Sequence, residues 1–306
     1  MSSESDFIES LKALATHPAA RGLADDAAML EFGGRSLVLT HDMLVEGVHY
    51  RPDDPPGDVA WKLVAVNLSD LAAKGARPLG VLLGYSLGED EWDEAFAAGL
   101  AAALSAFNLP LLGGDTVRGG GARTLALTAI GESDGPVPSR GGGKPGDPLW
   151  VSGTIGDSGA GLRGLGEALV ERYRNPRPRL EAGQRLAPLV GAMMDVSDGL
   201  LIDASRLAAA SGTAVEIDLA LVPLSEALLA AVGDGREARL AAATAGDDYE
   251  LLFAAPPQRV AEILALQDEL GLPLSRIGSL TEGSGLRLTD GDEAVRLPER
   301  LGWIHR

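Results

Sequence analysis

The chain has 306 residues, 45% of them hydrophobic, which is enough for two domains with ordinary cores. Its 26 Lys and Arg against 44 Asp and Glu give a net charge of −18, which argues against a surface for nucleic acid or anionic membranes. The absence of Cys excludes disulfides, thiolate zinc sites and cysteine nucleophiles. An acidic protein can still bind phosphates where Mg²⁺ supplies the positive charge.

The first residues, MSSESDF, are polar and acidic, unlike the basic start and apolar run of a signal peptide. The apolar stretches of the sequence are all shorter than the roughly 18 residues that span a bilayer. We therefore expect a cytoplasmic protein with neither a nucleic-acid nor a membrane partner.

Helical and strand patterns alternate along the first half, which favours an α/β or mixed α+β architecture. The long apolar segment DVAWKLVAVNLSDLAAKGA predicts a helix that ends at Gly75. The other elements expected in this half are, in order, a helix over 4–16, strands over 35–42 and 78–87, a helix over 90–107, and strands over 109–115 and 123–132.

The Gly- and Pro-rich segment 133–147 is the best candidate for a linker. We place the domain boundary within it, which gives an N-terminal domain of residues 1–137 and a C-terminal domain of residues 138–306. The second unit is expected to open with a strand over 148–153 and a Gly-rich helix over 156–169. It continues through an apolar helix after Gly199, apolar segments over 214–219 and 248–255, and a helix over 257–270.

Two glycine-rich segments imitate phosphate-binding motifs. GGGKPGD has Pro138 where a Walker loop needs its first Gly, and Pro145 where it needs Ser or Thr, so we interpret it as a linker. The second is a G-x-G-x-x-G match, which in a dinucleotide fold would follow a strand directly. Its three glycines instead fall inside the expected helix, which favours close helix packing; they are Gly159, Gly161 and Gly164.

The stretch MMDVSDGLLID places Asp195 and Asp198 between two apolar elements. One interpretation is helix capping, in which Asp195 or Ser197 accepts backbone N–H groups and Asp198 lies in the first turn. The other is a divalent cation. Further acidic residues also lie at the edges of apolar elements: Asp25, Asp26, Asp42, Asp70, Asp115, Asp247 and Asp248.

Asp70 is the most difficult of these to explain structurally, because it lies toward the C-terminal end of a helix that is apolar nearly all round. A buried carboxylate needs a cation or loses its charge. Lys74, four residues on, offers one partner. Within so apolar a helix we favour a metal ion.

Two arginines are candidates for phosphate binding, and one histidine is a candidate for a catalytic or binding role. Arg118 and Arg140 could clamp phosphate oxygens, although Arg118 is equally compatible with a solvated surface position. His49 is as compatible with an ordinary turn as with a function. Ser197 has no nearby His base in the sequence, so a Ser-His-Asp hydrolase is poorly supported.

The order of eight motifs carries more information than any one of them. They are DDAAML, THDMLVEGVHY, WKLVAVNLSDLAAKGARP, GGDTVRG, VSGTIGDSGAGL, MMDVSDGL, DDYELLF and GWIHR. Taken together over nearly the whole chain, they resemble the thiamine-monophosphate kinase family. That family belongs to a wider group of ATP-binding enzymes similar to aminoimidazole ribonucleotide synthetase.

The resemblance implies transfer of the γ-phosphoryl group of ATP to thiamine monophosphate, giving thiamine diphosphate and ADP. It implies an N-terminal domain that forms a homodimer through its sheet, and a C-terminal α/β domain. Several Mg²⁺ ions would bind Asp26, Thr40, Asp42, Asp70, Asp115, Asp195 and Asp198. ATP would contact Gly114, Asp115, Arg140 and Ser197, and the thiamine substrate His49, Asp247 and Trp303. No general base is implied, because the acceptor phosphate is already ionised.

Three positions depart from the family pattern. Ala24 replaces a usual Gly, and Asp247 stands where Glu is common, one methylene shorter. The family tends to place a Tyr near the nucleotide around residues 96 to 98, where this chain has FAA. Either Phe96 substitutes for that Tyr, or the base is less tightly stacked.

Other functions fit the sequence less well. Selenophosphate synthesis is disfavoured by the lack of Cys, and aminoimidazole ribonucleotide synthesis by the GWIHR and DDYELLF motifs. A non-catalytic nucleotide sensor is disfavoured because every metal aspartate is present, and a dinucleotide oxidoreductase rests only on the glycine triplet.

Overall fold

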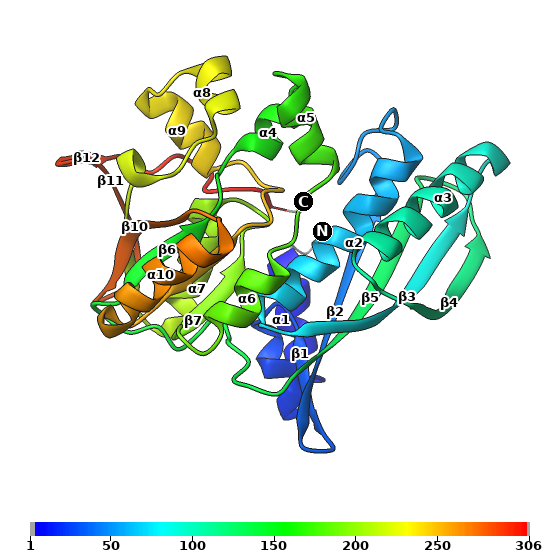
Figure 1. The fold of residues 1–306 in the computed structure, drawn as a ribbon, viewed down its shortest axis with the longest axis horizontal. Coiled ribbons are helices and arrows are strands. Elements are labelled where there is room, and N and C mark those ends of the chain that lie inside the picture. The colour runs from blue at the N-terminus through cyan, green and yellow to red at the C-terminus, as the bar shows by residue number, and fades with distance from the viewer. Residues whose placement is uncertain (1–3, 305–306) are drawn as a thin grey trace.

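The computed structural model describes residues 4–304, which form two α/β units side by side (Figure 1). A five-stranded sheet in the order β1-β2-β5-β3-β4 belongs to the N-terminal unit, and a seven-stranded sheet in the order β12-β11-β8-β10-β6-β9-β7 to the C-terminal unit. The expected two-part, mixed α/β architecture is therefore confirmed. None of the helices within residues 4–304 is long and apolar enough to cross a membrane.

The N-terminal unit has antiparallel strands apart from the parallel pair β3–β4. Its elements are α1 Glu4–Lys12, the 3-10 segment η1 Pro18–Leu23, β1 Ala28–Phe32, β2 Arg35–Val45, α2 Pro56–Ala73, β3 Arg77–Leu87, α3 Asp90–Ala106, β4 Leu111–Arg118 and β5 Thr124–Ser133. Helix α2 is buried over most of its 18 residues, as its apolar sequence predicts, and the chain turns away at Gly75 with φ +61°.

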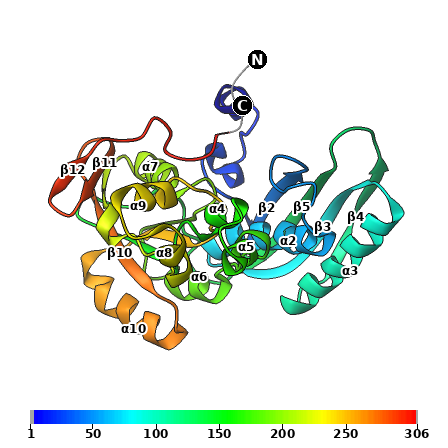
Figure 2. The same ribbon diagram turned by 90° about the horizontal axis from the view of Figure 1, so that it is seen from above.

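Only one face of this sheet is covered by helices. Strand β5 alternates between residues buried under α2, such as Leu125 and Leu127, and half-buried residues on the other face. Figure 2 shows α3 along the same side of the sheet as α2. Within the described residues no second layer covers the far face, and exposed apolar side chains gather on its strands: Leu30, Phe32, Met43, Leu82, Leu111, Leu112 and Val117.

The C-terminal unit has one parallel pair, β8–β11, in an otherwise antiparallel sheet. Its strands are β6 Pro148–Ser152, β7 Ala192–Asp195, β8 Ala214–Asp218, β9 Leu251–Ala254, β10 Leu274–Thr281, β11 Gly285–Asp290 and β12 Glu293–Val295. Its helices are α4 Asp157–Leu162, α5 Glu167–Arg174, α6 Leu180–Leu186, α7 Leu200–Ser211, α8 Glu226–Val232, α9 Arg236–Ala243 and α10 Val260–Leu270, with 3-10 segments η2 Leu219–Leu221 and η3 Pro257–Arg259.

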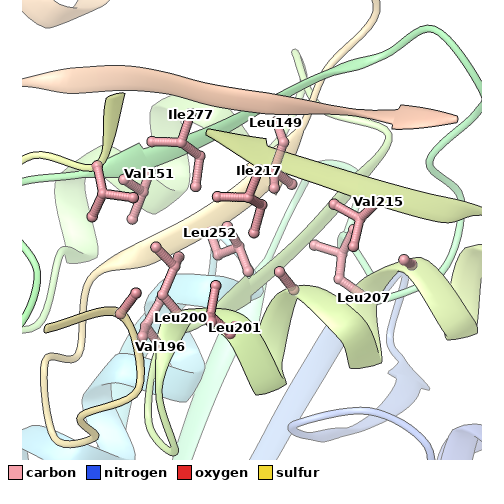
Figure 3. Packing of buried hydrophobic residues seen from close by; sticks show 14 of the residues in the cluster. Leu149, Val151, Val196, Leu200, Leu201, Leu207, Val215, Ile217, Leu252 and Ile277 are labelled. Carbon is pink, nitrogen blue, oxygen red and sulfur yellow. The ribbon is translucent and has the colours of Figure 1, made fainter. Parts of the chain in front are cut away.

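Strands β6, β9 and β7, which form one end of this sheet, are buried on both faces, which explains their continuous apolar sequences. Figure 3 shows one face, where Val151 and Leu252 meet Leu200 and Leu201 at the start of α7. Alternate residues of the same strands, such as Phe253, point to the opposite face and pack against α6 and α10. The sheet therefore holds β7, and with it Asp195, in a rigid position.

The Gly-rich segment differs from the single helix that the sequence predicts. Helix α4 ends at Leu162, and Gly164 and Gly166 adopt φ values of +73° and +139° before α5 begins. A Cβ on Gly161 would lie 2.0 Å from the carbonyl oxygen of Leu169, so the glycine allows α4 and α5 to touch. The triplet serves packing and a turn between helices, not a dinucleotide turn.

Candidate active site

Three aspartates from distant segments meet where the two units contact each other. One carboxylate oxygen of each of Asp26, Asp70 and Asp195 lies within 4.8 Å of the others. Asp26 comes from the turn before β1, Asp70 from the last turns of α2, and Asp195 from the end of β7. Because carboxylate oxygens are the ligands that Mg²⁺ prefers, this arrangement suits a divalent cation.

Hydrogen-bond donors orient two of these carboxylates. The hydroxyl of Thr40 on β2 donates to Asp70, and the hydroxyl of Ser69 donates to Asp195 at 2.6 Å. In the described part of the chain, no Lys or Arg forms an ion pair with either carboxylate. The site therefore holds two buried acidic groups without protein cations.

Crowding changes the proton affinity of the cluster. Burial, followed by the charges of Asp42, Asp195 and Asp26, raises the pKa of Asp70 well above its ordinary value. Burial and then Asp26 raise the pKa of Asp195 to about 8. The pKa of Asp42 rises to about 6, first through burial and then through Asp26 and Asp198. A divalent cation would relieve this repulsion and keep the carboxylates ionised.

Asp26 is different, because two protein cations contact it. Burial alone would raise its pKa, but Lys74 and Arg140 together lower it. Arg140 donates to Asp26 Oδ1 through Nε at 2.8 Å and Nη2 at 2.5 Å. Lys74 Nζ lies 2.5 Å from both Asp25 Oδ1 and Asp26 Oδ2, so the alternative pairing of Lys74 with Asp70 is wrong. The side chain of Lys74 reaches across to another segment instead of along its own helix.

The loop after β7 holds Ser197 and Asp198 beside the cluster. Helix α7 begins at Leu200 with Gly199 at its N-cap and no side-chain cap, so the capping interpretation of this motif is wrong. The backbone N–H of Trp303 donates to the carbonyl of Asp198 at 2.8 Å, which brings the C-terminal segment to this loop.

A second polar group lies at the start of α2. Lys62 is buried, and its Nζ lies 2.8 Å from Asp247 Oδ2 and donates to the carbonyl of His49 at 3.1 Å. It also lies 4.1 Å from the ring centroid of Tyr173. The hydroxyl of Tyr249 donates to Asp247 Oδ1 at 3.0 Å. The structure therefore brings His49 and Asp247 together, with Lys62 between them.

Gly114 and Asp115 do not reach the aspartate cluster within this chain. Gly114 on β4 lies in line with Asp42 on β2, but β3 and β5 stand between them. Three strand steps amount to about 14 Å. Asp115 lies in line with Met43 and so points to the uncovered face of the sheet, away from Asp42.

Comparisons with known proteins show the family of this chain. The family models "AIR synthase related protein, N-terminal domain" and "AIR synthase related protein, C-terminal domain" match residues 24–133 and 144–291. The thiamine-monophosphate kinase of Caulobacter vibrioides is 41% identical over 303 residues, covering 94% of this chain and 86% of its own. The chain belongs to the thiamine-monophosphate kinase family.

Solved structures of this family show the same fold. The structure of AaThiL complexed with AMPPCP and TMP has a TM-score of 0.87 at 32% identity, and the match covers 99% of this chain and 97% of that one. The thiamine-monophosphate kinase from Stenotrophomonas maltophilia K279a has a TM-score of 0.79 at 38% identity, with 95% and 96% covered.

The structure shows the consequences of two departures from the thiamine-monophosphate kinase pattern, at Ala24 and Phe96. Ala24 has φ −116°, which any residue adopts, so the loss of a Gly there introduces no strain. Phe96 is 2% exposed and packs between Trp92 and Tyr85, with ring centroids 5.4 and 5.0 Å away. The expectation that Phe96 could replace the nucleotide-stacking Tyr is therefore wrong, because its ring belongs to the core.

Asp203 is a site residue that the sequence analysis missed. Its Oδ2 accepts the backbone N–H groups of Ser197, Asp198 and Gly199 at 3.0, 3.0 and 3.2 Å. Burial raises its pKa to about 6 despite the charge of Arg206, which also pairs with Asp198 at 2.5 Å. Its position in the first turn of the helix that follows DVSDG could have indicated this role from the sequence.

Glu250 in the DDYELLF motif was also missed. Its fully buried carboxylate accepts from Ser152 Oγ at 2.6 Å and pairs with Arg172 at 2.9 Å and with Arg179. Asp248 accepts the backbone N–H of Gly156 with both oxygens. These two carboxylates stabilise the loops around Asp247 and do not themselves face the aspartate cluster.

Proposed function

We propose that this protein transfers the γ-phosphoryl group of ATP to the phosphate of thiamine monophosphate, producing thiamine diphosphate and ADP. Membership of the thiamine-monophosphate kinase family supports the reaction. The observation that carries the mechanism is the meeting of Asp26, Asp70 and Asp195 with raised pKa values on Asp70 and Asp195.

We propose that several Mg²⁺ ions bind at this cluster, held by Asp26, Thr40, Asp42, Asp70, Asp195 and Asp198. The donor set fits, because carboxylate oxygens of Asp26, Asp70 and Asp195 lie within 4.8 Å of one another and Mg²⁺ prefers such ligands. When bound, Mg²⁺ would neutralise the triphosphate of ATP and the phosphate of the acceptor, and it would stabilise the charge of the transferring phosphoryl group. The protein orients the carboxylates through Thr40 and Ser69, and it needs no strong general base.

Arg140 and Ser197 are the proposed ATP contacts within the chain. Arg140 has a guanidinium that is 24% exposed while paired with Asp26, so it can turn an N–H group toward a phosphate. For the thiamine side we propose His49, Asp247 and Trp303. The ring of Trp303 is 51% exposed and can stack on a heteroaromatic ring.

We propose a homodimer that buries the uncovered face of the N-terminal sheet. The exposed apolar residues there include Met43 and Val117, and Asp115 points to the same side. A partner chain seated on this face would receive Gly114 and Asp115 from its neighbour, which reconciles their proposed metal and ATP roles with the distance measured within one chain.

Changing Met43 to Glu should weaken this dimer, because it places a charge in an apolar interface. Leu264→Glu is a matched control, since Leu264 is similarly exposed but lies on α10. Analytical ultracentrifugation should show dissociation for the first variant only. Equal behaviour of the two variants would remove this face from the proposal.

We further propose domain boundaries at 1–137 and 138–306, because residues 134–147 separate the two sheets and contain no helix or strand. A cytoplasmic location fits the use of ATP as a co-substrate.

The reaction is tested by measuring ADP release with Mg·ATP, with and without thiamine monophosphate, together with chromatography for thiamine diphosphate. Product that requires both substrates and Mg²⁺ is expected. ATP binding without thiamine diphosphate would contradict the proposed acceptor and redirect the search to other small phosphorylated molecules.

A further inference from the structure

Lys74 follows the last turn of α2 and is completely buried. Its Nζ lies 2.5 Å from Asp25 Oδ1 and 2.5 Å from Asp26 Oδ2, and it donates to the carbonyl of Met193 at 3.3 Å. Two carboxylate oxygens and one backbone carbonyl oxygen therefore surround a single positive charge. The same kind of oxygen set holds hard cations in proteins.

The ammonium of Lys74 is the close polar partner of Asp26 Oδ2, at 2.5 Å, and both groups are buried. The same aspartate contributes an oxygen to the cluster with Asp70 and Asp195. The ammonium thus stands at the edge of the cluster and shares a carboxylate with it.

Protein cations divide the acidic cluster into two parts. Asp25 pairs with Arg21 at 2.6 Å and with Lys74, and Asp26 with Lys74 and Arg140. Asp70, in contrast, receives only the hydroxyl of Thr40 among the polar contacts of the described residues. One part of the cluster is neutralised by the protein itself, and the other is left for metal ions.

We propose that the ammonium of Lys74 is a resident cation that occupies a position which a divalent metal ion takes when the lysine is removed. This inference rests on the proposed function for the metal ions at Asp70 and Asp195. Lys74 is then a positioning residue, because its ammonium holds the carboxylate of Asp26 in place and the site needs one metal ion fewer.

The test compares wild type with Lys74→Met, which keeps most of the side-chain length but removes the charge. Mn²⁺ is titrated into each protein with a non-hydrolysable ATP analogue, and free Mn²⁺ is measured by electron paramagnetic resonance. We expect one additional Mn²⁺ per chain in the variant. Lys144→Met, at an exposed lysine, is the control and should keep the wild-type count. An unchanged count in Lys74→Met would overturn the inference.

Thermal unfolding gives a second readout. In EDTA, Lys74→Met should melt below wild type, because two buried carboxylates each lose one of their two cations. Mg²⁺ should raise the melting temperature of the variant more than that of wild type. The double variant Asp25→Asn/Lys74→Met removes one charge of each sign. It should fold in EDTA and bind no additional Mn²⁺, because the position has lost one of its two carboxylates.

A folding failure of the single variant is also a decisive result. If Lys74→Met does not fold at any Mg²⁺ concentration, no ion replaces the ammonium and the inference is wrong. An additional Mn²⁺ in the double variant would place the ion elsewhere and contradict it too. Failure of the proposed function is a separate result, since it appears as wild-type protein that forms no thiamine diphosphate.

Discussion

Asp70 combines burial with three neighbouring carboxylates, so its charge is unfavourable until a cation arrives. Replacing Asp70 by Asn should lower thiamine diphosphate formation by more than the roughly 100-fold that outer-shell partners of metals contribute. The same change should raise the melting temperature in EDTA, because it removes one repelling charge. Product chromatography and thermal unfolding measure the two effects. Near-normal activity would exclude Asp70 as a metal ligand.

Asp247 is held by Lys62 on one oxygen and by Tyr249 on the other. Asp247 and Tyr249 both have left-handed backbones, with φ +68° and +51°, so this short loop is strained and depends on its contacts. Lys62→Met should therefore raise the KM for thiamine monophosphate by about 10-fold and leave the KM for ATP unchanged. Steady-state kinetics, with Lys144→Met as the control, test this. An equal rise in both KM values would argue against a role on the thiamine side.

At the scale of elements, α2 connects the two units. It packs on the N-terminal sheet through its apolar residues, contacts α6 and β7 of the other unit, and carries both Lys62 and Asp70. The indole N–H of Trp61 on the same helix donates to the carbonyl of Pro176 at 2.9 Å. Because one rigid helix bears residues of the metal cluster and of the thiamine side, their separation is fixed by its length.

Helix α5 is joined to the N-terminal unit through Asp54. The buried carboxylate pairs with Arg51 at 3.1 Å and Arg174 at 3.0 Å, and accepts from the hydroxyl of Tyr173. Burial opposes the charge, but these partners lower the pKa of Asp54 below 3.8. Asp54→Asn should therefore reduce the free energy of unfolding by roughly 3 kcal/mol at pH 7. Asp53→Asn, whose side chain is 79% exposed, should have little effect.

The pH dependence of this contact has a definite sign. The pKa of Asp54 is lower in the folded than in the unfolded protein, so its ionised carboxylate stabilises the fold above about pH 3.8. This contribution is lost as the pH falls through the folded pKa of Asp54. The difference between wild type and Asp54→Asn should stay constant from pH 7 to 5 and shrink below about 3.8. Urea unfolding at several pH values measures it. A difference that grows on acidification would contradict the assigned contact.

At the scale of the whole molecule, the position of Asp115 predicts a site shared between two chains. Asp70→Asn and Asp115→Asn should each be inactive alone. After mixing and reassociation, a heterodimer would contain one site with both aspartates intact, if Asp115 is donated by the partner. Random pairing makes about half of the dimers heterodimers, and each of these has one intact site of two. About a quarter of wild-type activity should therefore return.

The measurement is thiamine diphosphate formation before and after co-refolding the two variants. If Asp115 served its own chain, every site in the heterodimer would lack one aspartate and no activity would return. This outcome would contradict the shared site while leaving the dimer itself untouched.

The sequence by itself determined the class of fold and the family. Periodicity predicted α2 and several strands of both sheets, since such patterns are local and repeat within one element, but it did not predict β1, β10, β11 or β12. The order of motifs identified the family, and the aspartates at element edges marked the cluster. Lack of Cys and the acidic balance had already removed several classes of function.

Only the tertiary structure decided which residues are partners. It paired Lys74 with Asp25 and Asp26 instead of Asp70, buried Phe96 in the core, and placed Asp115 three strands away from Asp42. Sequence spacing gives distances within an element, whereas these relations depend on how distant segments pack. The physical cause is burial: a buried charge is stable only beside an opposite charge or a metal ion, and packing alone determines which one it meets.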